Sequence, residues 1–198
     1  MSSIPEQIME YAETLPEGSP LCPRDFLDLG SSSAVHQAFS RLNRQDRLMR
    51  VFHGIYVKTV ETRFGIHGPR IEKVIESLSR LWGETIVPSG GGAANFLGLT
   101  TQVPMRLSFL TSGPSRQLKF RKLEIPLRHA PSWQLVGENR LAGTLVRALT
   151  FLSPDEAGEA MEKVLPGFSE VDVAELMAVR AVLPEWIAKP LGTFVNHD

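Results

Sequence analysis

Residues 31–58 read SSSAVHQAFSRLNRQDRLMRVFHGIYVK. The stretch opens with three serines, continues with apolar residues at helical spacing, and ends in two short apolar segments joined by Phe52-His53-Gly54. Any of the serines can cap a helix by accepting a hydrogen bond from a free backbone N–H. We therefore predict a helix from about Ser32 to Gln45, followed by a β-hairpin whose turn lies near His53.

The predicted helix has one apolar face and one polar face. At 100° per residue, its apolar side chains fall within one narrow sector that must face a core. This sector contains Val35, Ala38, Phe39 and Leu42. The opposite face carries Ser33, Gln37, Ser40 and Arg44, and His36 and Arg41 lie on its flanks. The exposed side of the helix is therefore expected to be polar and cationic.

Two shorter helices are predicted before this stretch. Apolar residues recur at helical spacing over 4–15, and Pro16 with Gly18 ends the run. Pro23 starts a second helix, which Gly30 ends. Three helices followed by a hairpin is the plan of a winged helix-turn-helix domain, which we predict over residues 1–60.

The net charge of -1 conceals a segregation of charge along the 198-residue chain. Residues 29–58 hold five Lys/Arg against one Asp, and residues 105–130 hold six against one Glu. Residues 141–198 hold four Lys/Arg against nine Asp/Glu. Charge fluctuates along any chain, but two basic segments and an acidic end indicate at least one anionic partner.

The residue types on the helix and hairpin suit DNA. Gln pairs with adenine and Arg with guanine in the major groove, and serines at a helix N-terminus hold phosphate oxygens. The candidate DNA-binding residues are Ser31, Ser32, Ser33, His36, Gln37, Ser40, Arg41, Arg44, Arg50, His53 and Lys58. Any solvated helix face also carries Ser, Gln and Arg, but such faces usually mix both signs of charge. The scarcity of acidic residues here favours DNA.

The remaining residues, 61–198, are predicted to form a mixed α/β domain with a small sheet and a helical end. Residues 69–82 form an amphipathic helix, and three strands follow within 105–130. Helices are expected over 141–152, 153–165 and 171–182. Gly90-Gly91-Gly92 lacks the spacing of either a P-loop or a dinucleotide fold, so close backbone packing is a better interpretation than phosphate binding. The fold class is thus α+β.

A second basic patch is expected on the predicted strands. Alternation along these strands directs Leu123, Ile125 and Leu127 to one face. It leaves Lys119, Arg121, Lys122 and Arg128 on the solvated side. This patch can extend a DNA footprint, receive an acidic partner or the acidic helices of a second subunit, or remain a solvated sheet face.

Catalysis is not expected from this sequence. The five histidines show no metal-binding spacing, Cys22 stands alone before Pro23, and no G-x-S-x-G motif occurs. We therefore predict no enzyme activity, no metal and no cofactor. With neither a secretory signal nor a long apolar segment visible, we expect a cytoplasmic location and no membrane contact.

Two segments carry a resemblance to a known family: Arg47-Leu48-Met49-Arg50-Val51 with Gly54-Ile55-Tyr56-Val57, and Leu97-Gly98-Leu99-Thr100-Thr101-Gln102-Val103-Pro104. Together with the order of elements over most of the chain, they resemble the antitoxins of AbiE-type (type IV) toxin–antitoxin systems and the wider group of AbiEi-like transcriptional regulators. That resemblance implies an N-terminal winged helix that binds the promoter of its own operon. It also implies a C-terminal domain tied to neutralising a nucleotidyltransferase-like toxin.

The sequence thus predicts a DNA-binding transcriptional repressor of the antitoxin type, with double-stranded DNA as its partner and a toxin as a further one. The alternative is a non-catalytic interaction module that binds a protein or RNA through its basic sheet.

Overall fold

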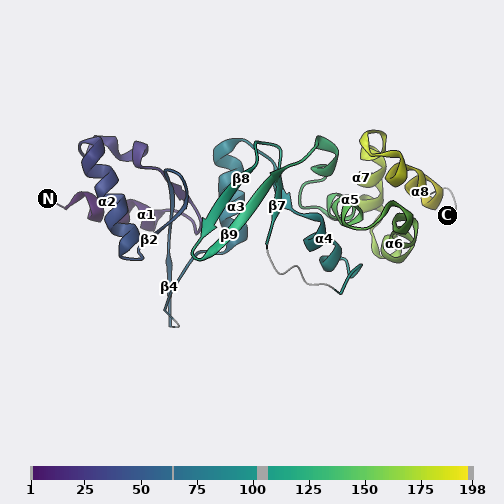
Figure 1. The fold of residues 1–198 in the computed structure, drawn as a ribbon, viewed down its shortest axis with the longest axis horizontal. Helices are drawn as coiled ribbons and strands as arrows, with labels where there is room; N and C mark the ends of the chain where they lie inside the picture. Colours follow the sequence, from purple (N-terminus) through teal and green to yellow (C-terminus); the bar gives the residue numbers. More distant parts are fainter. Residues whose placement is uncertain (1, 64, 102–106, 196–198) are drawn as a thin grey trace. The chain divides into compact units, whose positions relative to one another are not determined.

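The computed structural model describes residues 2–63, 65–101 and 107–195, and its fold is α+β, as predicted (Figure 1). The chain divides into two compact units. Unit 1 comprises Met1–Glu84 and Gln117–Ile125, and unit 2 comprises Thr85–Arg116 and Pro126–Asp198. These bounds follow spatial contacts and differ from a division after residue 60. The domain boundary predicted there stays a prediction.

Unit 1 begins with helices and a small sheet. The elements are α1 (Ile4–Thr14), β1 (Pro20–Leu21), the 3-10 helix η1 (Pro23–Leu29), α2 (Ser32–Arg44), β2 (Leu48–Phe52) and β3 (Ile55–Lys58). The three strands form an antiparallel sheet with the order β1-β3-β2. The second predicted helix is therefore a 3-10 helix, and the third ends one residue earlier than expected.

Local capping explains where the first helices begin. The Ser3 N–H donates to a Glu6 carboxylate oxygen at 2.6 Å, and this hydrogen bond lowers the pKa of Glu6. The Ser31 hydroxyl accepts a hydrogen bond from the Ala34 N–H at 3.3 Å, so Ser31 is the N-cap of α2. Each cap satisfies a backbone donor that has no partner within its helix.

A row of aromatic rings runs from the exposed Tyr11 into the unit 1 core. The ring centroids of Tyr11 and Phe26 lie 5.4 Å apart, those of Phe26 and Phe39 5.5 Å, and those of Phe39 and Tyr56 5.0 Å. Phe39 is fully buried. Because these rings come from α1, η1, α2 and β3, they fix the polar face of α2 on the outside of the unit.

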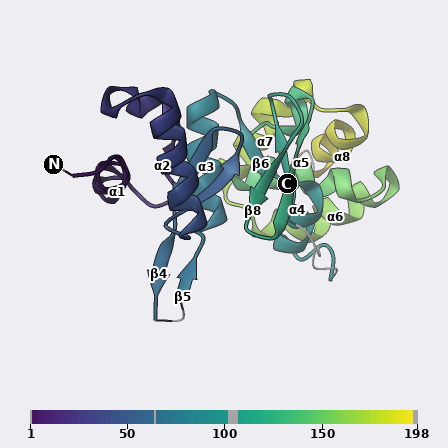
Figure 2. The ribbon, with the colours of Figure 1, turned by 60° about the vertical axis from the view of Figure 1, so that its left-hand side comes forward.

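Two strands and a helix complete the N-terminal part of unit 1. Strands β4 (Val60–Thr62) and β5 (Gly65–His67) pair as a two-stranded ribbon, which extends away from α1 and α2 (Figure 2). Helix α3 (Ile71–Trp82) follows and ends at Gly83, whose φ of 66° is left-handed. The sequence predicted the helix but not the ribbon.

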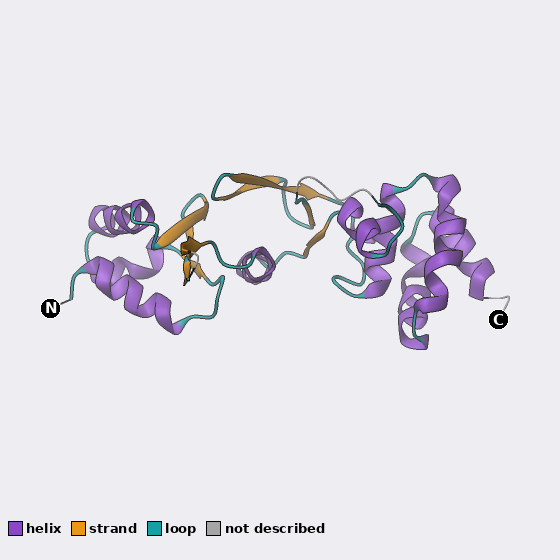
Figure 3. Ribbon diagram, turned by 90° about the horizontal axis from the view of Figure 1, so that it is seen from below, coloured by secondary structure: helices purple, strands orange, loops and turns teal. Residues whose placement is uncertain are grey.

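Unit 2 contains the rest of the chain, and its C-terminal part consists of helices (Figure 3). Its elements are β6 (Ile86–Pro88), α4 (Gly90–Phe96), β7 (Phe109–Thr111), η2 (Ser132–Gln134), α5 (Leu141–Phe151), η3 (Pro154–Glu156), α6 (Ala157–Val164), η4 (Leu165–Gly167), α7 (Glu170–Val179), η5 (Arg180–Val182) and α8 (Glu185–Val195). Strands β8 (Arg116–Phe120) and β9 (Leu123–His129) belong partly to each unit. The strand order is β6-β7-β9-β8, with β7 and β9 parallel.

Several predicted elements of unit 2 differ in detail. The strand expected over 105–112 covers Phe109–Thr111, and its first two residues lie outside the described residues. The helix expected over 153–165 is a 3-10 turn followed by α6, because Ser153 and Glu156 form a capping box around Pro154. Helix α8 was not predicted, since Pro190 lies inside it.

Gly90-Gly91-Gly92 forms the first turn of α4. A Cβ on Gly90 would lie 2.5 Å from the Arg147 carbonyl oxygen and 2.8 Å from Thr150 Oγ1. Glycine at position 90 therefore permits close packing of α4 on α5, as the sequence predicted. A Cβ on Gly92 would meet no atom within 4 Å.

Arg147 is the largest fully buried side chain of unit 2 and is 1% exposed. Its Nη2 donates to the carbonyl of Glu138, a residue with φ of 41°. Nε and Nη1 have no hydrogen-bond partner among the described residues. Burial lowers the pKa of Arg147 to about 10. The guanidinium therefore stays charged at neutral pH and holds the loop before α5.

Among the described residues, no helix is both long and apolar enough to cross a membrane.

Candidate nucleic-acid interface

Helix α2 presents a continuous polar face to solvent. Every candidate residue on it is exposed: Ser31, Ser32, Ser33, His36, Gln37, Ser40, Arg41 and Arg44. The residues predicted to face the core, Val35, Ala38, Phe39 and Leu42, are all buried. Helix α2 packs on α1, η1 and β2. These contacts fix the orientation of the helix, so its polar face stays directed to solvent.

The basic residues of α2 lie at the end of the helix where its dipole favours positive charge. Its first turn contains no acidic residue, and Arg41 and Arg44 lie in its last turn, where cations are favourable. Arg44 Nε donates to the Ser40 carbonyl at 3.4 Å, and this hydrogen bond leaves the end of the guanidinium exposed. The free N–H groups of the first turn lie beside the three serines. An anion is therefore favourable at either end of the outer face.

The β2–β3 hairpin carries a second pair of candidate residues. Arg50 Nη2 and His53 Nδ1 lie 2.7 Å apart, and Arg50 Nε donates to the Phe52 carbonyl at 3.4 Å. Because a guanidinium only donates, Arg50 is the donor and His53 Nδ1 the acceptor in this contact. The Arg50 N–H donates to Asn43 Oδ1 at 3.0 Å, so this strand is tied to α2.

Lys58 is engaged elsewhere. Its ammonium lies 2.6 Å from a carboxylate oxygen of Glu13, and its side chain is 29% exposed. The predicted DNA-contact residue Lys58 thus forms an ion pair with α1. This pair could not be predicted from the sequence because the partners are 45 residues apart.

The second basic patch is exposed as predicted, with one difference. Lys119 lies on β8, Arg121 and Lys122 form the β8–β9 turn, and all three are exposed. Arg121 has φ of 57°, and its Nη2 donates to the Ile66 carbonyl of β5. Leu123, expected to point inward, is 59% exposed at the end of the turn. Arg128 is exposed in unit 2 and is described apart from the other three.

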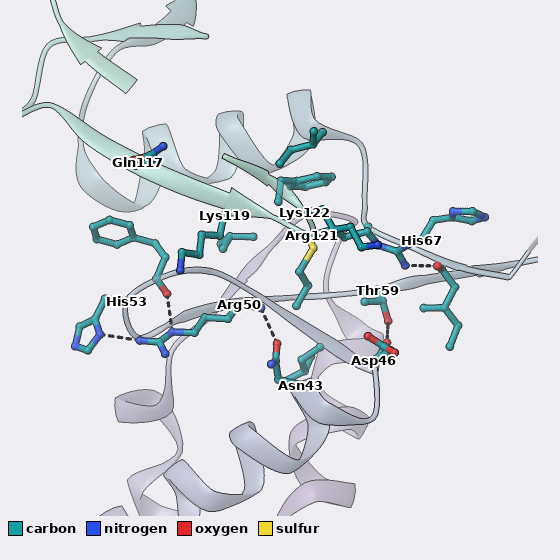
Figure 4. Close-up of a pocket in the computed structure, with 18 residues that line it drawn as sticks. Asn43, Asp46, Arg50, His53, Thr59, His67, Gln117, Lys119, Arg121 and Lys122 are labelled. Carbon is teal, nitrogen blue, oxygen red and sulfur yellow. Dashed lines mark hydrogen bonds between the residues drawn. The ribbon is translucent and has the colours of Figure 1, made fainter. Parts of the chain in front are cut away.

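The two basic segments meet at an open pocket of about 1200 Å³ in unit 1 (Figure 4). The β2–β3 hairpin supplies Arg50 and His53, and β8 with its turn supplies Lys119, Arg121 and Lys122. Asp46 is the one acidic residue among the described residues that line the pocket. The sequence predicted the two sets separately. It did not predict their convergence, although the shared sign of charge was visible.

Gly68 allows β8 to reach this pocket. A Cβ at position 68 would lie 2.9 Å from two carbons of the Phe120 ring and 3.1 Å from the Met49 methyl group. The Phe120 ring therefore packs directly on the backbone after β5. Together with the Arg121 hydrogen bond to Ile66, this contact fixes the β8–β9 turn beside the ribbon.

The described residues offer no candidate metal centre. They contain no group of three or more His, Cys, Asp or Glu side chains that could hold a metal ion. Cys22 is buried, and burial raises the pKa of its thiol. A raised pKa makes a thiol a weak nucleophile at neutral pH.

The chain belongs to a family of unknown function, DUF6088, whose model matches residues 7–168. The matched region includes α2, the β2–β3 hairpin and the whole pocket. No curated protein matches the sequence.

Proposed function

We propose that the chain is a sequence-specific double-stranded DNA-binding protein whose residues 1–60 act as a winged helix-turn-helix. In this proposal α2 is the recognition helix, η1 precedes it, and the β2–β3 hairpin is the wing. The function that follows is transcriptional repression of its own promoter.

One observation carries this proposal: the outer face of α2 is exposed, polar and free of acidic residues over its whole length. A major groove admits an α-helix, and Gln and Arg are the side chains that read adenine and guanine there. Ser31–Ser33 lie at the helix N-terminus, where backbone N–H groups favour phosphate. Arg50 and His53 on the hairpin are exposed and suit contacts to the DNA backbone.

The antitoxin role rests on the sequence resemblance. Within it, the helical unit 2 is the part that would contact a nucleotidyltransferase-like toxin. The net acidic charge of residues 141–198 suits a basic protein partner better than DNA. A cytoplasmic location follows from the same proposal.

Single substitutions on α2 test the proposed recognition helix. Arg44→Ala and Gln37→Ala are each expected to weaken binding to the specific DNA site by roughly 1–3 kcal/mol, because each removes a base contact. Binding to a labelled duplex from upstream of the chain's own gene, followed by fluorescence anisotropy, measures the effect. Unchanged affinity in both variants would show that α2 does not contact the DNA.

A further inference from the structure

We propose that the pocket between the β2–β3 hairpin and the β8–β9 turn binds a phosphate group. The phosphate comes either from the DNA backbone or from a free nucleotide. The proposal deepens the proposed function where the source is DNA, and it stands without that function where the source is a nucleotide.

The first support is a concentration of positive charge that exceeds the negative charge beside it. Arg50, Lys119, Arg121 and Lys122 line one pocket, against Asp46 alone among the acidic residues described there. Neither Lys119 nor Lys122 makes a hydrogen bond or ion pair with any residue that the structure describes. Like charges gathered in a concave surface raise the local potential, and an anion lowers their mutual repulsion.

The second support is the arrangement of donors. Figure 4 shows Lys119 and Arg50 extending toward the same side of the pocket, beside His53. The hydrogen bonds of Arg50 to His53 and to the Phe52 carbonyl hold its guanidinium at the pocket rim. A planar guanidinium and a neighbouring ammonium are the groups that most often hold phosphate oxygens. We assign Arg50 and Lys119 as the principal phosphate ligands.

Arg121 has a different role in this proposal. Its guanidinium donates to the Ile66 carbonyl and its backbone is left-handed, so the residue fixes the turn. Lys122 follows it in the turn and is exposed. We therefore treat Arg121 as a positioning residue and Lys122 as an exposed third cation.

The third support is the apolar side of the pocket. Leu123 is 59% exposed and Ile66 is 40% exposed, and both line the pocket, as does Phe120. A ligand that combines phosphate with an apolar or aromatic part covers such a surface. Nucleotides, free or within a nucleic acid, have this chemistry.

A paired charge reversal tests the proposal in the full-length chain. Lys119→Glu with Lys122→Glu changes only exposed side chains, and the matched control is Lys73→Glu with Arg80→Glu on α3, two exposed residues outside the pocket. Binding of ADP by isothermal titration and of a random-sequence duplex by anisotropy are measured for each protein. The pocket variant should lose about tenfold or more in affinity for at least one probe, while the control keeps the affinity of the unchanged chain.

The measurements with ADP and with the duplex together identify the source of the phosphate. Loss of affinity for the duplex with a smaller dependence on salt assigns the pocket to the DNA backbone. Loss of affinity for ADP with unchanged duplex binding assigns it to a free nucleotide. Equal binding of both probes by the pocket variant and the unchanged chain would overturn the proposal. Alanine at Gln37 and Arg44 should leave ADP binding intact, so failure of the proposed recognition helix is distinguished from failure of the pocket.

Discussion

Replacing Gln37, Arg41 and Arg44 together by alanine is expected to lower the affinity for the specific DNA site by on the order of 100-fold or more. Each of these side chains is exposed on the outer face of α2. The three side chains are neighbours on one helix face, so their losses add only in part. Two base contacts at roughly 1–3 kcal/mol each already correspond to about 100-fold in affinity. Affinity for the upstream duplex, measured by anisotropy at fixed salt, gives the result.

The matched control for this triple variant is Arg80→Ala. Arg80 is an exposed cation of the same unit, and its Nη2 lies 3.5 Å from a Glu76 carboxylate oxygen on its own helix. The control should bind as the unchanged chain does. Thermal unfolding should be alike in all three proteins, because the substituted side chains contact solvent. An equal loss of affinity in the control would show that the effect comes from net charge alone. It would contradict the proposal that α2 recognises the DNA sequence.

Gly143→Ala is expected to destabilise the chain by about 3 kcal/mol. Gly143 lies in α5, and a Cβ there would overlap the Val136 carbonyl oxygen and lie 2.9 Å from the Gly137 carbonyl carbon. Both neighbours are backbone atoms of the loop that Arg147 holds through Glu138. Neither can move aside as the end of a side chain does, so the helix or the loop must shift.

Gly158→Ala is the control for this substitution. Gly158 also lies inside a helix, α6, and a Cβ there would meet no atom within 4 Å. Alanine at position 158 should be neutral or stabilising by up to about 1 kcal/mol, because glycine is the poorer helix former. Chemical denaturation of both variants measures the difference. Equal stability of the two variants would show that α5 does not pack against this loop as described.

The face of α2 could be predicted from the sequence because a helix obeys a fixed period. Val35 and Phe39 are buried and Gln37 and Arg44 exposed, as a rotation of 100° per residue requires. The same period predicted most helix bounds, and the serines at 31–33 predicted the cap of α2. Neither prediction needs information about the rest of the chain.

The pocket could not be predicted, since it depends on contacts between distant segments. Arg50 and Lys119 line one surface although 69 residues separate them in the chain. Strand alternation places Leu123 on the same side of β9 as the buried Ile125. Leu123 nevertheless follows the β8–β9 turn directly and is 59% exposed. Strand alternation gives the side of a sheet, and burial depends on what packs there.

The glycines that allow close packing could likewise be predicted only in part from the sequence. Three consecutive glycines indicated close packing in general, yet Gly90 abuts the Arg147 carbonyl and Gly92 faces open space. Gly143 gave no signal, because a single glycine within a helical pattern shows only a weaker helix. Which glycine a packing contact requires is a property of the tertiary structure.

The most direct test of the central claim is the affinity of the unchanged full-length chain for duplex DNA over a series of salt concentrations. Two duplexes of equal length are compared, one from upstream of its own gene and one with that sequence scrambled. We expect a preference for the upstream duplex of roughly 1,000-fold or more. We also expect log K to fall with log[salt] with a slope of about -0.9 for each phosphate contact. Equal affinity for both duplexes, together with a flat response to salt, would contradict sequence-specific DNA binding by this chain.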